Sequence, residues 1–535
     1  MTVTDAPVPA AAPAPVREAE VEVRRRPGGL AATLGTADPI VLARLWIAAS
    51  TLFLFAAGVS GAIIGVERLD TASIDVLDGA LGDLASLHTS AGIFLFLVPM
   101  TLGIATAVVP LQLGAATVAF PRGAAAAFWI WLLSGGVMIA SYFIDGGPVG
   151  SDPDGVALWY VGLGGVLVGI LLATTTVLTT LWAGRVAGMH LDRVPLFSWA
   201  LLVAGSVWLV SLPVLLAVLV LQYLGVRYGS FEQVPLAAWA TSAPQVFAYA
   251  LPALGFLLDA VAVASGRRLA NRGVLLAAIG AAGVLSFGAD LVASGEDPSI
   301  FEDVLYVGAA FVLVLPLLAI GGGIGATLRR GRPALTSGLL FGIGAYLMIL
   351  TAAAINAVRV IDGLDLTGTT ADSSVAHYAL LGGLIGVAGA VHHWSSKIFG
   401  VVLGEGPARL GAVVLLVGTV TLALPDLISG FLDQPANLLP GQPEDGVEAL
   451  NLVSLIGGAI VIAGVLIVVV NVLAGAARRD DAPVPPDPWG TGQTLEWLAL
   501  SPPDVAGVGP LDPVVSAEPL LDLKEREGVE PEEGT

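Results

Sequence analysis

Long apolar stretches follow one another along most of this chain, and polar residues gather in short segments between them. Twelve stretches reach about 20 residues or more, the length an α-helix needs to cross the apolar core of a bilayer. They lie near 42–66, 87–110, 124–145, 157–184, 196–224, 235–263, 273–294, 302–327, 336–358, 373–402, 408–434 and 450–475. This pattern predicts an all-α integral membrane protein, a twelve-transmembrane-helix bundle. The composition agrees, since 56% of the residues are hydrophobic and only 12% are charged, far outside the soluble range.

Basic residues are distributed unevenly between the two ends of the predicted helices. An even number of crossings places both termini on one side, and an excess of Lys and Arg marks the cytoplasmic side. Eighteen bases flank the termini and the loops on their side, whereas only Arg68, Arg227 and Arg359 flank the other side. We therefore expect a multi-pass protein of the plasma membrane with both termini in the cytoplasm.

The two ends of the chain differ from the apolar middle. Residues 1–35 are rich in Ala, Pro and charge, and we expect a disordered cytoplasmic arm before a membrane domain at 36–478. Residues 479–535 form an acidic, Pro-rich cytoplasmic tail, in which 13 acids and 2 bases from residue 480 onward give −11 of the net charge of −20. Such a composition is typical of a solvated extension rather than of a packed domain.

The chemistry available to the chain is limited by its lack of cysteine. Disulfides, thiolate metal sites and covalent c-type haem attachment are excluded, and no basic face with interleaved aromatic residues suggests nucleic acid. Five histidines remain as candidate ligands. His88 and His377 fall near the starts of the second and tenth predicted helices, which both run inward from the same side. The two imidazoles therefore share a depth and could hold a haem iron between them, or they are two unrelated, hydrogen-bonded interfacial histidines.

The other three histidines are weaker candidates for haem or metal ligands. His190 falls in a loop, where a solvated histidine needs no further explanation. His392 and His393 follow His377 by 15 and 16 residues, or roughly 23 Å along a helix, so they cannot serve the same iron. Their neighbours Trp394 and Lys397 favour an interfacial aromatic and basic belt at the cytoplasmic end.

Three stretches resemble subunit I of the haem-copper oxidases, the cytochrome c oxidase family. "LHTSAGIFLFLVPMTLGIATAVVPLQLGAATVAFPR" (Leu87 to Arg122) is similar to the second helix and following loop of that subunit, and "DPWGTGQTLEWLALSPP" to its segment after the membrane domain. "HYALLG", which begins at His377, resembles the tenth-helix motif HFHYVL without its first His. The resemblance covers residues 35–505 and implies that His88 and His377 ligate a low-spin haem. Pairing "VAH" with that motif instead makes His377 the counterpart of the high-spin haem ligand.

The chain departs from the family at the motifs that carry oxygen chemistry. The sixth-helix motif HPEVY, with a copper-ligating His, a proton-carrying Glu and a Tyr crosslinked to that His, corresponds to "APQVF" here, and the seventh-helix WAHHMF corresponds to "FGADLV". Copper prefers nitrogen ligands, which these replacements do not supply. The high-spin haem ligand, the channel lysine and the loop acid are replaced as well. The positions concerned are Ala243, Gln245, Phe247, Ala289, Asp290, Val375, Ile320 and Thr117.

Two further replacements affect proton input and haem binding. An asparagine of the loop after the second helix corresponds to Ala124, and the two arginines that hold the haem propionates correspond to Ala436 and Asn437. These losses are mutually consistent, because a protein without an oxygen-reducing centre has no pump to supply, and buried ionisable groups are costly.

The resemblance and the departures together imply a respiratory-chain membrane subunit with one low-spin haem of a or b type, no copper and a role in electron transport. It would work beside other respiratory-complex subunits, with cytochrome c or a quinol as electron donor. One alternative is a haem-free structural pseudo-oxidase subunit. A second alternative is a functional terminal oxidase subunit I.

Overall fold

The computed structural model describes residues 29–69, 81–229, 238–287, 300–436, 446–478, 483–504, 507–509 and 511–527. Ala289, Asp290 and Asn437, which the sequence comparison singles out, lie outside these described residues.

Eleven helical segments of the described residues are long and apolar enough to span a membrane. One of them, Leu81–Leu113, is built from α3 (Leu81–Ser90), the π-helix η1 (Ala91–Leu97) and α4 (Val98–Leu113). The span Trp239–Ser265 joins the short η4 (Ala238–Thr241) to α8 (Gln245–Ser265). The other spans are α2 (Pro39–Glu67), α5 (Pro121–Ser141), α6 (Pro153–Ala183), α7 (Leu196–Tyr228), α11 (Ile300–Leu328), α12 (Ser337–Arg359), α13 (Thr370–His393), α15 (Glu405–Gly430) and α16 (Glu448–Ala477).

The remaining elements are short. They are α1 (Leu30–Leu34), α9 (Arg272–Leu285), α14 (Ser395–Ile398), α17 (Pro519–Arg526) and the 3-10 turns η2 (Tyr142–Ile144), η3 (Leu191–Arg193), η5 (Asp362–Leu364) and η6 (Leu495–Trp497). Among the described residues, the β pairing consists of two isolated bridges, Thr369 with Pro435 and Val484 with Ser501. The prediction of an all-α membrane protein is therefore confirmed.

The number of membrane crossings is confirmed for eleven of the twelve predicted stretches. The predicted stretch 273–294 coincides with α9, whose 14 residues are too few to span a bilayer. The rest of that stretch, from residue 288, lies outside the described residues. Twelve crossings thus remain a prediction.

Several helices begin where their sequence provides a cap. Asp38 accepts hydrogen bonds from the backbone N–H groups of Ile40 and Val41 at 2.8 and 3.3 Å, and Asp152 accepts one from Gly155 at 2.7 Å. Each aspartate is followed by a proline in the first turn, where no backbone N–H is required. These short-range interactions set the starts of α2 and α6.

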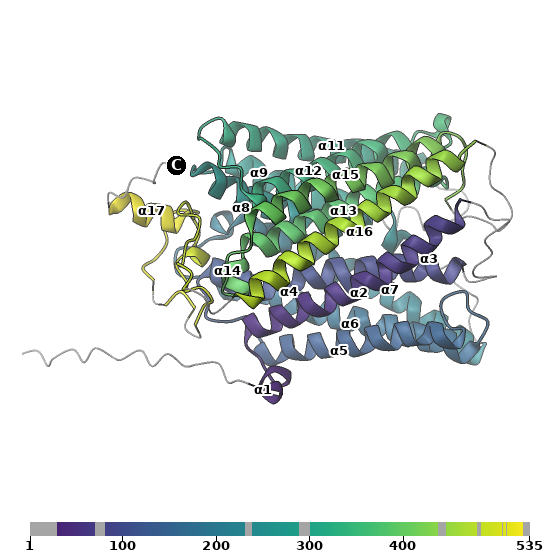
Figure 1. Ribbon diagram of the computed structural model, residues 1–535, viewed down its shortest axis with the longest axis horizontal. Coiled ribbons are helices and arrows are strands. Elements are labelled where there is room, and N and C mark those ends of the chain that lie inside the picture. Colours follow the sequence, from purple (N-terminus) through teal and green to yellow (C-terminus); the bar gives the residue numbers. More distant parts are fainter. Residues whose placement is uncertain are drawn as a thin grey trace, which may run out of the picture.

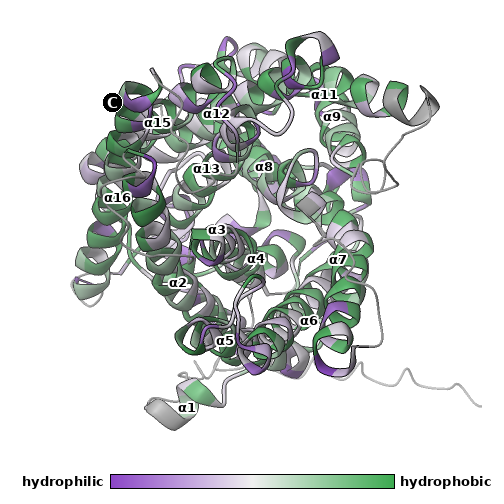
Figure 2. Cartoon of the chain, turned by 90° about the vertical axis from the view of Figure 1, so that its right-hand side faces the viewer, coloured by the Kyte–Doolittle hydropathy of each residue, from purple (hydrophilic) through white to green (hydrophobic). Residues whose placement is uncertain are grey.

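The helices surround a fully buried centre. Viewed along the bundle, α3 and α4 lie inside a ring that includes α2, α5, α6, α7, α8 and α13 (Figure 2). In the most apolar windows of the spans, 94% of the residues of Leu81–Leu113 and all of those of Trp239–Ser265 are buried, against 22% for α2 and α16. The outer helices thus present apolar side chains outward, as a lipid-facing surface requires.

The first and last described helices lie at the same end of the bundle, as α1 and α17 show in Figure 1. We call this the tail end, because residues 483–527 pack there, and we call the other end the far end. Lys397 is completely buried at the tail end and donates to the carbonyl oxygens of Pro486 and Ala499, at 2.7 and 2.5 Å, and to Ser501 Oγ at 3.1 Å. These bonds hold the segment 483–504 on the bundle.

The expectation of a solvated tail is wrong for its described part. All three residues of η6 are at most 1% exposed, so this segment is buried against the bundle. The acidic side chains of the next segment are neutralised from the membrane domain, because Arg268 forms ion pairs with Glu518, Asp522 and Glu525. The composition of the tail predicts neither the burial of η6 nor the pairing of its acids with Arg268, because the surface and the base that make these contacts come from other parts of the chain.

Candidate functional site

The two histidines predicted to act together lie side by side near the far end. The ring centroids of His88 on α3 and His377 on α13 are 6.3 Å apart, with the ring planes inclined by 75°. The residues are 289 positions apart in the chain, so only the packing of the two helices brings them together. The prediction that they share a depth agrees with this geometry.

Each ring is oriented through its Nδ1 atom. His88 Nδ1 lies 2.8 Å from the carbonyl oxygen of Ala57 on α2, and His377 Nδ1 lies 3.1 Å from Asp426 Oδ2 on α15. Because a carbonyl and a carboxylate only accept, each Nδ1 carries a hydrogen, which leaves Nε2 as the ring nitrogen that can ligate a metal. Backbone carbonyls and carboxylates orient metal-ligating histidines in this way.

The backbone around His88 is shaped for its ring. A Cβ atom on Gly61 of α2 would lie 2.7 Å from both Nδ1 and Cε1 of His88, so only glycine allows this approach. Three residues after His88 the chain enters the π-helix η1, an uncommon form that often accompanies functional sites. The position of His88 therefore depends on two local features of the backbone.

A buried charge network extends from His377 toward the far end. Asp426 is 1% exposed, and its Oδ1 lies 2.9 Å from Arg68 Nη1 and 3.4 Å from Ser454 Oγ. The carboxylate thus connects His377 on α13 to Arg68, which ends α2. Neither Asp426 nor Arg68 was proposed as a site residue from the sequence, although an acid inside the apolar stretch 408–434 is a functional signal.

The donor set of this site fits a haem iron. Two axial imidazoles bonded through nitrogen at about 2.0 Å place their ring centroids about 6 Å apart, which agrees with the observed 6.3 Å. Both Nε2 atoms are left to ligate the iron, and both Nδ1 atoms are already engaged. Across the described residues, groups of three or more His, Cys, Asp and Glu side chains that would suit a metal ion are absent, so the pair suits a metal that brings its own equatorial ligands.

The positions that correspond to the oxygen site of the family are scattered over several elements. Gln245 is completely buried at the start of α8, where its Nε2 donates to Ser211 Oγ at 3.0 Å and its Oε1 has no hydrogen-bond partner. Phe247 follows it in the same buried turn, and Ala243 precedes it at partial exposure. Val375 and Ile320 are buried on α13 and α11, and Thr117 is exposed in the loop after α4.

Helix α13 packs directly on α8 through glycines. A Cβ on Gly386 would lie 2.2 Å from Ala253 Cβ, and one on Gly383 would lie 3.5 Å from Ala250 Cα and 2.9 Å from Leu97 Cδ2. Small residues allow two membrane helices to approach this closely. At Gly386 the two helices leave less room than a methyl group occupies, whereas at Gly383 the close contact is with Leu97 of η1.

The other three histidines are separate from the pair. His190 is exposed in the loop before η3, as predicted. The prediction of an interfacial belt for His392 and His393 is wrong, because each is 2% exposed. Trp489 stacks on His393 with a centroid distance of 5.6 Å, and Trp497 contacts it edge-on. Both tryptophans belong to the docked tail segment, whose packing the sequence pattern does not indicate.

A second polar cluster lies at the tail end and was also missed. Asp259 on α8 accepts from the first backbone N–H groups of α7, Leu196 at 3.0 Å and Phe197 at 3.2 Å. Gln112 Nε2 donates to Asp259 Oδ2 at 3.0 Å and to Glu496 Oε1 of η6 at 3.2 Å. Two buried carboxyl groups therefore share one amide, and one of them belongs to the tail.

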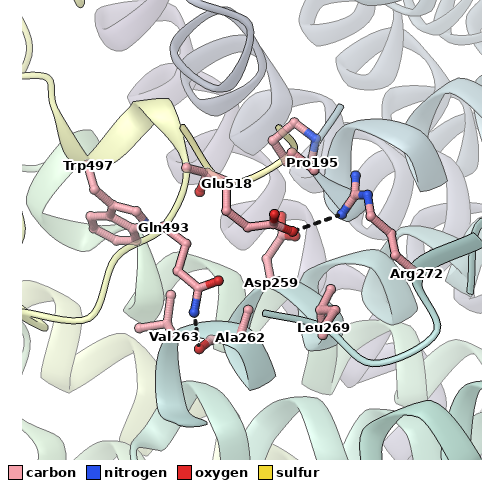
Figure 3. Close-up of a pocket in the computed structure, with 11 residues that line it drawn as sticks. Pro195, Asp259, Ala262, Val263, Leu269, Arg272, Gln493, Trp497 and Glu518 are labelled. Carbon is pink, nitrogen blue, oxygen red and sulfur yellow. Dashed lines mark hydrogen bonds and ion pairs between the residues drawn. The ribbon is translucent and has the colours of Figure 1, made fainter. Parts of the chain in front are cut away.

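A small cavity adjoins this cluster. Figure 3 shows Asp259, Arg272, Gln493 and Glu518 around it. Gln493 donates to the carbonyl of Ala262 at 2.8 Å, while its Oε1 is buried without a partner. The cavity lies at the tail end and the histidine pair near the far end, so the two sites are separate in space.

Docking of the tail is expected to weaken as the pH rises. Burial, together with the nearby charge of Asp259, raises the pKa of Glu496 from 4.5 to about 7. Because the folded state holds this proton more tightly than the unfolded chain, the stabilisation is fully present below pH 4.5 and is lost as the pH rises through about 7. We expect up to about 3 kcal/mol of lost stability, measured as lower hydrogen-exchange protection factors in residues 483–504 at pH 8 than at pH 5, each calculated against the intrinsic exchange rate at the same pH. Glu496→Gln should flatten this profile, and an unchanged profile in that variant would contradict the assignment.

Comparison with known proteins identifies the family. The sequence pattern of the family "Cytochrome C and Quinol oxidase polypeptide I" matches residues 41–460. Cytochrome c oxidase subunit 1 of Bacillus subtilis (strain 168) is 27% identical, with 93% of this chain and 84% of that protein covered. Cytochrome c oxidase subunit 1 of Thermostichus vulcanus is also 27% identical, with 87% and 88% covered.

The fold agrees with the sequence comparison. A chain of a heme-copper terminal oxidase dimer solved by cryo-electron microscopy superimposes with a TM-score of 0.64, over 92% of this chain and 98% of that chain, at 14% sequence identity. The family match extends across the paired histidines and into the first half of the final span, and the shared fold includes nearly the whole chain. The chain therefore belongs to the haem-copper oxidase subunit I family, as a membrane-spanning member of the cytochrome c and quinol oxidase polypeptide I group.

Proposed function

We propose that this chain holds one low-spin haem between His88 and His377 and passes electrons within a respiratory membrane complex without reducing oxygen. The observation that carries the proposal is the pair itself, with ring centroids 6.3 Å apart and both Nδ1 atoms held by acceptors. When bound, a haem with two axial imidazoles supplies a one-electron site. The haem is of a or b type.

Each residue of the site has a definite part in this proposal. His88 and His377 present Nε2 to the iron, and Asp426 holds His377 in the required tautomer and orientation. Gly61 provides the space into which the His88 ring fits. The polar network is fully buried at Asp426, so water has little access to it.

The loss of oxygen chemistry is supported by the residues at the start of α8. Ala243 and Phe247 offer no ligand atom, and the Gln245 amide cannot carry a proton as a carboxyl does. All five histidines of the chain are described: one pair near the far end, one in a loop, and two beneath the tail. The close approach of α13 to α8 at Gly386 leaves no room for a cofactor between these two helices at that level, which further supports the loss of oxygen chemistry.

The setting of the protein follows from its family and charge pattern. We place the tail end in the cytoplasm because 18 of the 21 bases outside the last segment flank that side. We expect other respiratory-complex subunits as partners, and cytochrome c or a quinol as the electron donor.

A haem-free structural subunit is the second candidate. Its support is the polar network in which Asp426 is hydrogen-bonded to His377 and ion-paired with Arg68, which joins α13, α15 and α2 without any ligand. A functional terminal oxidase is the third possibility, suggested by the names of the relatives.

One set of measurements on the purified full-length protein separates these functions. We expect a reduced-minus-oxidised spectrum of a low-spin haem, one haem per chain by pyridine haemochrome, no copper by elemental analysis and no oxygen consumption. Absence of bound haem would favour the structural role. Two haems together with copper, or oxygen consumption, would show a working oxidase.

A further inference from the structure

Arg68 has a buried donor without an acceptor. Its side chain is 12% exposed, and Nη1 is paired with Asp426, but Nη2 is buried and has no hydrogen-bond partner within the described structure. A buried guanidinium N–H that lacks an acceptor is costly. The neighbouring Asn451, 4% exposed, donates to the Arg68 carbonyl at 3.0 Å and leaves its own Oδ1 without a partner. Arg68 and Asn451, which we call the corner of the far end, therefore each keep one buried polar atom without a hydrogen-bond partner among the described residues.

The corner is connected to the histidine pair from both sides. Asp426 bonds Arg68 through Oδ1 and His377 through Oδ2. On α2, Gly61 touches the ring of His88 and lies seven residues before Arg68, which is roughly 10 Å along the helix axis. This length is comparable to the separation between the centre of a haem and its propionate carboxylates.

The other bases of the far end are occupied elsewhere. Arg227 pairs with Asp154, and Arg359 pairs with the carboxylate of Asp372 at 2.6 Å. Among the described residues of this end, Arg68 is the base that the Asp426 network joins to the histidine pair. A guanidinium group presents five N–H donors in a fixed planar arrangement, so one arginine can hold two carboxylates through different nitrogens.

We propose that Nη2 of Arg68 binds a propionate carboxylate of the haem held by His88 and His377, an inference that rests on the function proposed above. Arg68 then bridges two carboxylates, Asp426 through Nη1 and the propionate through Nη2. The propionate gives the buried Nη2 donor the acceptor that it otherwise lacks. The residue thereby replaces the arginines that correspond to Ala436 and Asn437.

The test compares iron protoporphyrin IX with its dimethyl ester, in which both propionates are uncharged. The full-length protein is made in a host that cannot synthesise haem, purified, and titrated with each compound. A charge-assisted hydrogen bond gives the wild type a preference of about tenfold or more for the free acid. Arg68→Gln should remove this preference, Arg68→Lys should restore part of it, and the control Arg227→Gln should retain it. Arg68→Gln also leaves Asp426 without its ion-pair partner. This change affects the binding of both compounds equally, so the ratio of their affinities within one variant is free of it.

The midpoint potential of the bound haem is a second readout. Loss of the Arg68 cation should lower the potential in Arg68→Gln but not in Arg227→Gln, because a nearby positive charge favours the reduced form. Equal binding of acid and ester by the wild type, or an unchanged preference in Arg68→Gln, overturns the role of Arg68 while leaving the haem site intact. Failure of the wild type to bind either compound overturns the proposed function and this inference with it.

Discussion

His88→Ala and His377→Ala should each abolish the low-spin haem spectrum of the purified protein. Either change removes one of the two axial nitrogens, so the iron can no longer be six-coordinate through imidazoles. The rings come from helices that are far apart in the chain but lie 6.3 Å apart by centroid, so no third histidine can take over. Absorption and electron paramagnetic resonance spectra of the two variants measure the effect.

Two controls separate ligation from general damage to the fold. His190→Ala changes an exposed loop histidine and should leave the spectrum intact. Gly61→Ala should weaken haem binding by about tenfold or more, since overpacking costs about 1–3 kcal/mol, whereas Gly58→Ala adds a Cβ with nothing within 4 Å. A normal low-spin spectrum in either His88→Ala or His377→Ala would refute the pair as axial ligands.

Lys397→Met should release the C-terminal segment from the bundle. The side chain is fully buried and donates three hydrogen bonds, to two backbone carbonyls and one hydroxyl of residues 486–501. Burial lowers the pKa of Lys397 to about 8, so the amine is still mostly charged at pH 7. Removing it leaves buried acceptors unpaired, and we expect a loss of about 3 kcal/mol or more. Limited proteolysis should then cut within residues 483–527 at much lower protease concentrations.

Lys524→Met is the matched control for this result. Lys524 also holds the tail, through Asp487 at 2.9 Å and the carbonyl of Gly490 at 2.7 Å, but its side chain is 22% exposed. Water reaches the partly exposed amine of Lys524 and can replace its bonds, so the expected loss is smaller than for Lys397→Met, about 1 kcal/mol. Equal protease resistance of Lys397→Met and the wild type would show that the tail is held by its tryptophans instead.

The membrane fold could be predicted from sequence because hydrophobicity is a local property. A run of about 20 apolar residues must form a helix in lipid, since no other backbone there satisfies its own hydrogen bonds within one segment. Eleven predicted stretches accordingly match spans of the structure. The twelfth illustrates the limit, because α9 ends at Leu285, and the predicted stretch from residue 288 lies outside the described residues.

The candidate site could be predicted only in part. His88 and His377 were identified because histidine is rare in apolar stretches and because both helices start from the same side. The sequence does not identify their supporting residues: only the fold places Asp426 beside His377, and a glycine such as Gly61 in an apolar helix has no distinguishing pattern. Only the contact of a ring with Gly61, where a Cβ would lie 2.7 Å away, reveals its role.

The tail was predicted least well, and its packing on the bundle also explains why the prediction for His392 and His393 was wrong. Composition describes residues 479–535 as acidic and unable to form a core, but Trp489 and Trp497 complete an existing surface at His393 rather than build a core of their own. Arg268 and Lys397, which stabilise the segment, lie more than 80 residues before it.

The sequence by itself determined the membrane class, the helical segments, the family resemblance and the identity of the two histidines, because each depends on residue type and short-range spacing. The tertiary structure decided which groups meet: Asp426 with His377 and Arg68, Gly386 with Ala253, and Lys397 with the docked tail. Such contacts join residues that are tens to hundreds of positions apart. They arise from the packing of whole helices, which no local pattern of hydrophobic and polar positions encodes.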